Sequence, residues 1–118
     1  MIVVNGNNVN FVETKDEIVG KGPVTKRPLI DTKATNGFGA ALVRFEPGAR
    51  LNFHTHASEQ ILYVTEGKGI VATKDKEYVI TPGCIVFIPA GEVHWHGATK
   101  DSALSHIAIQ KTGIKLAE

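Results

Sequence analysis

The sequence predicts an all-β fold, a double-stranded β-helix or jelly-roll barrel, from three observations. Short runs of alternating or β-branched residues recur along the chain, and no window shows a sustained helical repeat. Turn-forming Gly, Pro, Asn and Asp separate these runs. Strands this short and this evenly spaced are typical of sandwiches and barrels, in which a sheet folds over its own core.

At least eight candidate strands follow from this pattern. Their ranges are 38–45, 50–55, 60–66, 69–74, 77–80, 85–88, 93–96 and 103–110. Segments such as Glu46-Pro47-Gly48 and Thr81-Pro82-Gly83 supply the fixed or positive φ that the intervening turns need. We expect the barrel proper over residues 38–112, preceded over residues 1–37 by an N-terminal arm with one or two edge strands.

Length, charge and cysteine content exclude several classes of protein. A chain of 118 residues without an internal repeat or linker suits a single domain, residues 1–118. Cys84 is the single cysteine and no signal peptide is recognisable, so a cytoplasmic location is expected. A net charge of +1 with scattered Lys and Arg argues against nucleic-acid partners, and the apolar runs are too short for a membrane span.

The histidines carry the strongest functional signal. Four of the five form two His-x-His pairs, His54 with His56 and His94 with His96. Residues two apart on a strand point to the same face, so each pair can converge on one interior point. Neutral imidazole is a common ligand of divalent transition metals. The pairs therefore indicate an interior metal site, with an inert histidine core as the structural alternative.

The segments around these pairs resemble the two motifs of the cupin superfamily. The first motif, G-x5-H-x-H-x3/4-E-x6-G, is matched in spacing by Gly48, His54, His56, position 60 and Gly67. The second, G-x5-P-x-G-x2-H-x3-N, is met by Gly83, Pro89, Gly91 and His94. The sequence departs from them at Gln60, where Glu is usual, and at Ala98, where Asn is frequent. The resemblance implies that His54, His56, Gln60 and His94 are the metal ligands.

This implied ligand set consists of three imidazoles and one amide, all neutral. The +2 charge of the metal is then uncompensated by protein, which makes it a stronger Lewis acid. Four protein ligands around an ion that prefers six leave two positions open for a substrate. We expect one divalent transition metal, and Mn, Fe, Ni, Co and Zn are all compatible with this ligand set, because affinity order alone does not select among them. Glu59 stays an alternative to Gln60, because a bulge would bring its carboxylate inward.

A narrower resemblance covers roughly Phe45 to Gln110. There the chain is similar to the small manganese-containing cupin hydroxynitrile lyases, also labelled carboxymuconolactone-decarboxylase-type cupins, which share Gln60 as fourth ligand type. The resemblance implies that manganese is the first expectation for the metal, with iron, nickel, cobalt or zinc as alternatives. It also implies that His106 is a base beside the metal, His96 a second pocket histidine and Gln110 a polar wall residue. Strand alternation agrees for His106 and Gln110, which share one face. The alternative for His96 is support of a ligand through a hydrogen bond.

Three functions are compatible with these residues: a metal-dependent lyase or isomerase acting on a small hydroxy or carbonyl compound, a metal-dependent dioxygenase, and a non-catalytic small-molecule-binding cupin. Metal identity and oxygen uptake separate the first two. The chain shows no appended DNA-binding segment, which favours an enzyme over a binding module. We further expect a homodimer, formed through an edge strand supplied by Met1-Ile2-Val3-Val4.

Overall fold

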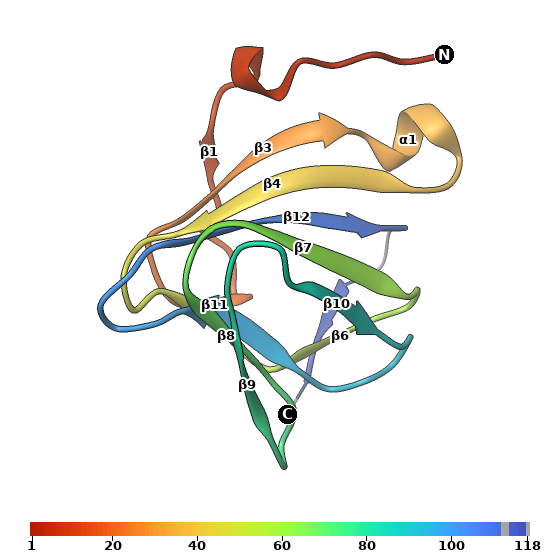
Figure 1. Ribbon diagram of the computed structural model, residues 1–118. Coiled ribbons are helices and arrows are strands. Elements are labelled where there is room, and N and C mark those ends of the chain that lie inside the picture. The colour runs from red at the N-terminus through yellow and green to blue at the C-terminus, as the bar shows by residue number, and fades with distance from the viewer. Residues whose placement is uncertain (112–113, 118) are drawn as a thin grey trace.

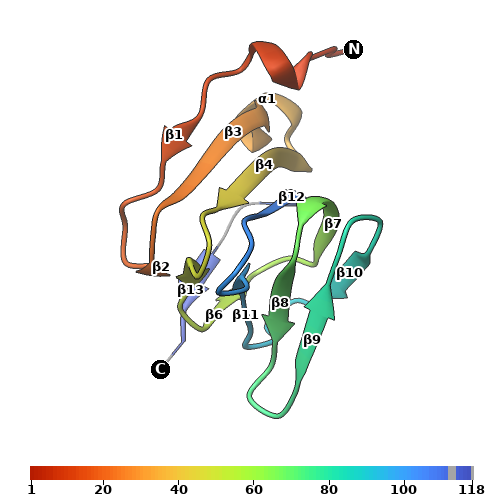
Figure 2. The ribbon, with the colours of Figure 1, turned by 60° about the vertical axis from the view of Figure 1, so that its left-hand side comes forward.

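Antiparallel strands build the molecule, and the computed structural model describes residues 1–111 and 114–117. One sheet has six strands in the order β1 (Val12–Glu13), β3 (Val24–Ile30), β4 (Gly39–Phe45), β12 (Leu104–Gln110), β7 (Gln60–Gly67) and β10 (Ile85–Ile88). A second sheet has five in the order β2 (Val19–Lys21), β5 (Arg50–Leu51), β11 (Trp95–Ala98), β8 (Gly69–Ala72) and β9 (Glu77–Ile80). A small sheet pairs β6 (His54–His56) with β13 (Ile114–Leu116). Figures 1 and 2 show the two larger sheets facing each other.

Helices contribute little. A 3-10 helix spans Gly6–Asn8, and the four-residue helix α1 (Thr32–Thr35) joins β3 to β4. No helix of the described residues is long and apolar enough to cross a membrane.

The apolar core lies between the two large sheets. Phe45, Leu62, Val64 and Leu104 are completely buried, and each projects inward from the six-stranded sheet. Leu62 and Val64 alternate with outward residues along β7, as the period of two in the sequence requires. Burial of each such large apolar side chain stabilises the fold by ~1.5–3 kcal/mol. The all-β prediction is confirmed, and most of the predicted strands recur within one or two residues.

Two predicted strands differ from the structure at places where a backbone group pairs elsewhere. The predicted strand 50–55 is divided into β5 and β6, because the Asn52 amide nitrogen donates to the Ile18 carbonyl at 2.7 Å and its side chain donates to the Glu17 carbonyl at 2.9 Å. The predicted strand 93–96 starts instead at Trp95. His94 precedes it in an isolated antiparallel bridge to His54.

The N-terminal segment contributes more than the predicted one or two edge strands. β1 and β2 are edge strands, but β3 lies between β1 and β4 inside the six-stranded sheet. Residues 1–4 form no strand in the structure and are exposed. At the other end, β13 extends beyond the predicted barrel, whose expected last residue, 112, lies outside the described residues.

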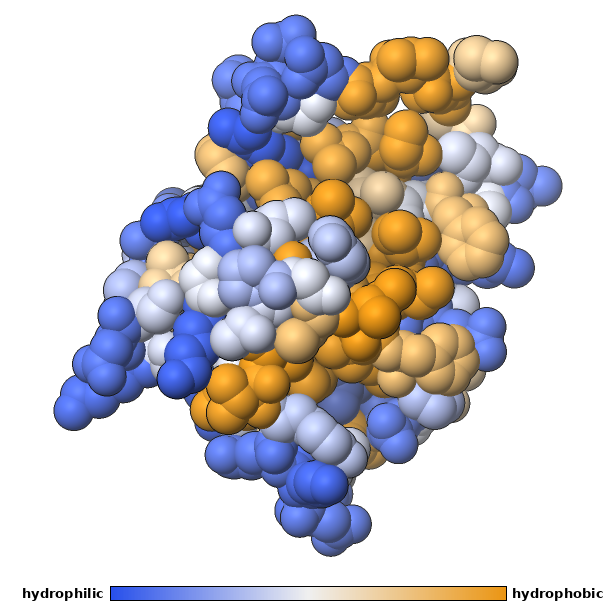
Figure 3. All heavy atoms as spheres, viewed as in Figure 1, coloured by the Kyte–Doolittle hydropathy of each residue, from blue (hydrophilic) through white to orange (hydrophobic). Residues whose placement is uncertain are grey.

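The outer surface of the six-stranded sheet is unusually apolar. Tyr63 and Ile85 are 45% and 69% exposed, and Phe87 is 58% exposed. Apolar residues gather over this side of the molecule in the space-filling view (Figure 3).

Two glycines with positive φ provide a matched test of packing at the turns. Gly67 has φ +80°, and a Cβ there would lie 1.8 Å from the Ala103 carbonyl oxygen; Gly83 has φ +92° and would meet nothing within 4 Å. Both alanine substitutions incur the ~1–2 kcal/mol cost of a left-handed backbone, but only Gly67→Ala adds overpacking of ~1–3 kcal/mol. Urea unfolding should therefore show a greater loss for Gly67→Ala. Equal losses would contradict the packing argument.

Candidate metal centre

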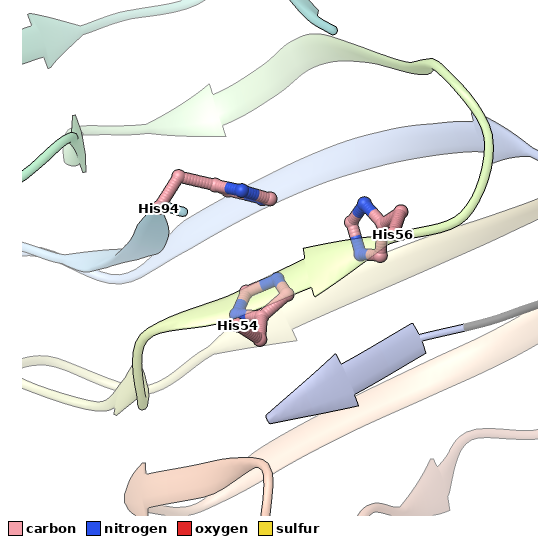
Figure 4. Close-up of side chains that lie close together, drawn as sticks. All are labelled: His54, His56 and His94. Carbon is pink, nitrogen blue, oxygen red and sulfur yellow. The ribbon is translucent and has the colours of Figure 1, made fainter. Parts of the chain in front are cut away.

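Three imidazoles converge in the interior of the barrel. His54 and His56 project from the same side of β6, and His94 reaches the same space from the segment before β11 (Figure 4). One ring nitrogen of each lies within 4.8 Å of those of the other two. All three residues are almost completely buried. The β-bridge between His54 and His94 joins the two segments, so backbone pairing brings the side chains together.

Backbone carbonyls fix the tautomers of two of these histidines. His54 Nδ1 lies 2.7 Å from the Asn52 carbonyl oxygen, and His94 Nδ1 lies 2.9 Å from that of Glu92. A carbonyl only accepts hydrogen bonds, so Nδ1 carries the proton in each neutral ring. The lone pair of each ring is then on Nε2. This is the arrangement that orients histidine ligands in metal sites.

Four buried polar atoms without a hydrogen-bond partner form a set of potential metal ligands. His54 Nε2, His56 Nδ1, His94 Nε2 and Gln60 Oε1 are buried and have no hydrogen-bond partner within residues 1–111 and 114–117. A buried polar atom without a partner costs ~1–3 kcal/mol. Three imidazole nitrogens suit Mn, Fe, Co, Ni or Zn as divalent ions, and an amide oxygen is compatible with them. The residues present therefore fit a transition-metal ion.

Gln60 is oriented by Gln110. The two residues are register partners on β7 and β12, and Gln60 Nε2 donates to Gln110 Oε1. This hydrogen bond engages the nitrogen of the Gln60 amide and leaves its oxygen free. Gln60 is 4% exposed, whereas its neighbour Glu59 is an exposed residue. Gln60, rather than Glu59, is thus the one of the two that is buried in the barrel.

His96 and His106 form a second buried pair. His106 Nε2 lies 3.0 Å from His96 Nδ1. The His96 ring also lies close to the metal-ligand candidates, with ring-centroid distances of 5.5 Å to His54 and 5.7 Å to His94. Phe45 packs against both members of the pair. His96 therefore lies between the three convergent imidazoles and His106.

Burial keeps all five histidines neutral at pH 7. Loss of hydration lowers the pKa of His54 to about 4, that of His56 to about 3 and that of His106 to about 4. Burial also lowers the pKa values of His94 and His96, and the neighbouring His106 contributes further to the shift of His96. Neutral imidazoles can bind a metal or accept a proton.

An open cavity of about 910 Å³ gives access to these groups. His54, His56 and Gln60 line it together with His96, His106 and Gln110. Its apolar wall includes Val24, Pro28 and Ile30 from β3. The sequence analysis placed that strand in the arm and missed its part in the cavity, because Lys26 and Arg27 obscure the alternation of Val24 with Ile30. The cavity brings together every site residue predicted from the sequence except His94, which is joined to it through the His54 bridge.

Interior imidazoles with free lone pairs, reached through an open cavity, define a β-barrel that can hold a metal ion beside a small ligand. The chain belongs to the cupin family, since a family model described as a cupin domain matches residues 41–109. This match confirms the predicted resemblance and, with the structures below, the jelly-roll fold.

Individual relatives are consistent with this assignment. The (R)-mandelonitrile lyase of Granulicella tundricola is 40% identical over 100 residues, covering 78% of this chain and 76% of that protein. The crystal structure of a cupin-like protein from Thermotoga maritima superposes with a TM-score of 0.83 at 32% identity, covering 89% and 83% of the two chains. The polyketide cyclase RemF of Streptomyces resistomycificus superposes with a TM-score of 0.85 at 22% identity, covering 100% and 86%, which shows the shared fold alone.

The lowered histidine pKa values predict acid sensitivity of the metal-free protein. In the unfolded chain a histidine is protonated below about pH 6.5, whereas in the folded chain His106 stays neutral until the pH approaches its lowered pKa of about 4. Between these two pH values the unfolded chain therefore binds more protons than the folded chain. The free energy of unfolding should therefore fall as pH decreases from 6.5 to 4. His106→Gln removes one such group, so its slope should be smaller by up to ~1.4 kcal/mol per pH unit. Urea unfolding across this range measures both slopes; identical slopes would show that His106 does not titrate in this way.

Proposed function

We propose that this cupin is a metal-dependent lyase that cleaves or forms a carbon–carbon bond next to a hydroxyl or carbonyl group, in the manner of a hydroxynitrile lyase. One observation carries the proposal: two of the three convergent imidazoles and the His96–His106 pair line the same cavity. A site for an electrophilic ion and a neutral base then face one ligand. The 40% identity to an (R)-mandelonitrile lyase supports this reaction class.

In this proposal His54, His56, Gln60 and His94 hold the metal through the four unpartnered atoms described above. Manganese is the first expectation, with iron, nickel, cobalt or zinc as alternatives. When bound, the ion supplies Lewis acidity that lowers the pKa of a hydroxyl group or polarises a carbonyl. The Gln110 side chain keeps the Gln60 oxygen directed to the site by occupying the Gln60 nitrogen.

His106 is the proposed base of the reaction. It is neutral at pH 7 because burial lowers its pKa, so it can accept the hydroxyl proton of a cyanohydrin. As that proton leaves, the carbonyl forms and the electrons of the carbon–carbon bond depart with cyanide. The imidazolium then returns the proton to cyanide, and the products are an aldehyde and hydrogen cyanide. His96 holds the His106 ring through the 3.0 Å contact between them.

The cavity wall fits the hydrocarbon part of a small substrate. Val43 and Ala108 line it on the same sheet as the apolar residues of β3, and Leu51 lines it from the five-stranded sheet. Apolar surroundings bind an aryl or alkyl group through the hydrophobic effect and exclude water from the reacting atoms. The residues in register around His106, which are Lys26, Val43 and Val64, include no carboxylate. The acidic residues that line the cavity, Asp16, Glu17 and Asp31, lie outside this row.

Two histidine variants distinguish metal binding from base chemistry. His54→Ala should lose the metal, because it removes a ligand, whereas His106→Ala should retain it and lower (R)-mandelonitrile cleavage by ~10²–10⁴-fold, the usual contribution of a general base. Elemental analysis of both proteins and spectrophotometric detection of benzaldehyde measure the two effects.

Control measurements separate the outcomes. Wild-type protein without cleavage activity toward cyanohydrins would contradict the lyase proposal, and oxygen consumption by the metal-loaded protein would favour a dioxygenase. Equal metal loss in His54→Ala and His106→Ala would show that His106 is a ligand.

Gln110 should affect metal affinity through Gln60. Gln110→Leu removes the acceptor that orients the Gln60 amide, so metal binding should weaken by ~10–100-fold, as for other residues that orient ligands. Gln110→Glu keeps an acceptor at the same position and should retain more of the affinity. Competition with a fluorescent chelator measures both dissociation constants. If both variants bind metal as wild type does, the Gln110 hydrogen bond has no such role.

A further inference from the structure

Two neighbouring cations on β3 have opposite surroundings. Arg27 lies on the outer face of the sheet, where its Nη1 donates to the Gly6 carbonyl at 3.2 Å and its guanidinium carbon lies 4.3 Å from the centroid of the Phe11 ring. Strand alternation directs Lys26 to the inner face, and Lys26 lines the cavity. Within the described part of the chain, Lys26 takes part in no ion pair. The fold thus engages the first cation and leaves the ammonium of the second at the cavity.

Lys26 is the one ionised residue among the described inward positions of β3, β4, β12 and β7, which lie side by side in the six-stranded sheet (Figure 1). The inward polar residues of β12 and β7 that line the cavity are His106, Gln110 and Gln60, and all three are neutral. The other inward residues of β3 and β4 carry no charge, and they include Val24, Pro28, Ile30, Ala41, Val43 and Phe45. A ligand on this face of the sheet therefore meets a single fixed positive charge.

Three carboxylates also line the cavity, and they lie outside these strands. Asp16 and Glu17 belong to the segment between β1 and β2, and Asp31 follows β3. Each of the two aspartates accepts a hydrogen bond from a backbone amide of its own turn, at 3.1 Å and 2.9 Å. Among the described residues, none of the three carboxylates forms an ion pair with the Lys26 ammonium. That ammonium is therefore available to a ligand.

The strand register sets the distance between Lys26 and the proposed base. Lys26 pairs with Val43, and Val43 pairs with His106. Adjacent strands lie ~4.8 Å apart, so the backbones of Lys26 and His106 are separated by about 10 Å, and both side chains rise from the same face. One small ligand can reach the His106 ring with one end and the Lys26 ammonium with the other.

We propose that Lys26 is a specificity-determining residue and that the substrate carries a carboxylate at the end remote from its reacting hydroxyl or carbonyl group. This inference rests on the proposed function, because it takes the reacting group to lie beside His106. The carboxylate accepts a charge-assisted hydrogen bond from the Lys26 ammonium. The interior favours an anionic ligand as well, since a divalent ion held by neutral ligands meets no buried carboxylate of the described chain.

A carboxylate and the corresponding neutral amide test the proposal by equilibrium binding. The probes are para-hydroxymethylbenzoate and para-hydroxymethylbenzamide, which are similar in shape and differ in charge at the end opposite the hydroxyl group. Isothermal titration calorimetry of the metal-loaded protein should show about 5-fold tighter binding of the benzoate, the upper value for an ion pair at an exposed lysine. Lys26→Met should bind the two probes equally, and Lys26→Arg should retain the preference for the benzoate.

Lys111→Met is the matched control. Lys111 also lines the cavity, but its ammonium lies over the Phe38 ring, 5.8 Å from the ring centroid. This variant removes the same charge from the protein and should keep the preference for the benzoate. Loss of the preference in Lys111→Met but not in Lys26→Met would place the carboxylate at the wrong lysine and overturn the proposal.

The remaining outcomes separate this inference from the lyase reaction. Equal binding of the two probes by the wild-type protein, or no binding of either, overturns the proposal. A preference that survives in Lys26→Met does so too, because the carboxylate then binds elsewhere, such as at the metal ion. Neither probe reacts in this assay, so the result does not depend on turnover. A protein that prefers the benzoate through Lys26 but cleaves no cyanohydrin would contradict the proposed function alone.

Discussion

Buried imidazole nitrogens without protein partners are the constraint on which the rest of the structure depends. Each unpartnered atom costs ~1–3 kcal/mol in the folded state. The barrel offsets this with completely buried apolar side chains such as Phe45, Leu62 and Leu104, each of which contributes ~1.5–3 kcal/mol. Backbone carbonyls at Asn52 and Glu92 then hold two of the rings in one tautomer. The site is thus organised by the protein before any ion binds.

Strand alternation couples this interior to the outer surface. On β7 the inward Gln60 is followed by the outward Ile61, and on β12 the inward His106 is followed by the outward Ile107. A register slip of one residue would exchange the two sets. The ladder between β7 and β12 is irregular at Ser105/His106, where a β-bulge or similar register shift precedes the histidine. The residue without a register partner is Thr65 on β7, whereas β12 pairs regularly with β4 from Leu104 to Gln110. The irregularity therefore changes the phase of β7, and β12 keeps the alternation that directs His106 and Gln110 to the cavity.

Short-range pattern predicted the fold and part of the site, and long-range contacts account for the rest. Alternation within one strand explains why His54 and His56 both point to the interior, and why His106 and Gln110 do so as well. It does not explain the interruption at Asn52, because the hydrogen-bond partners of Asn52 at residues 17 and 18 are distant in sequence. The contact of His96 with His106 likewise joins two strands that belong to different sheets. The cavity role of β3 was hidden because charged residues interrupt its apolar alternation.

The charge balance of the interior restricts the chemistry further. The buried polar residues of the described chain are histidines, Gln60 and Ser105, and none of them is acidic. A divalent ion in this site would therefore face no buried protein anion, and a proton accepted by His106 would add positive charge at short range in a medium of low dielectric constant. That proton must pass quickly to an anion formed by the substrate. A reaction that generates a basic leaving anion beside His106, as the proposed cyanohydrin cleavage does, would satisfy this requirement, whereas storage of a neutral ligand transfers no proton and makes no use of a neutral base at that position.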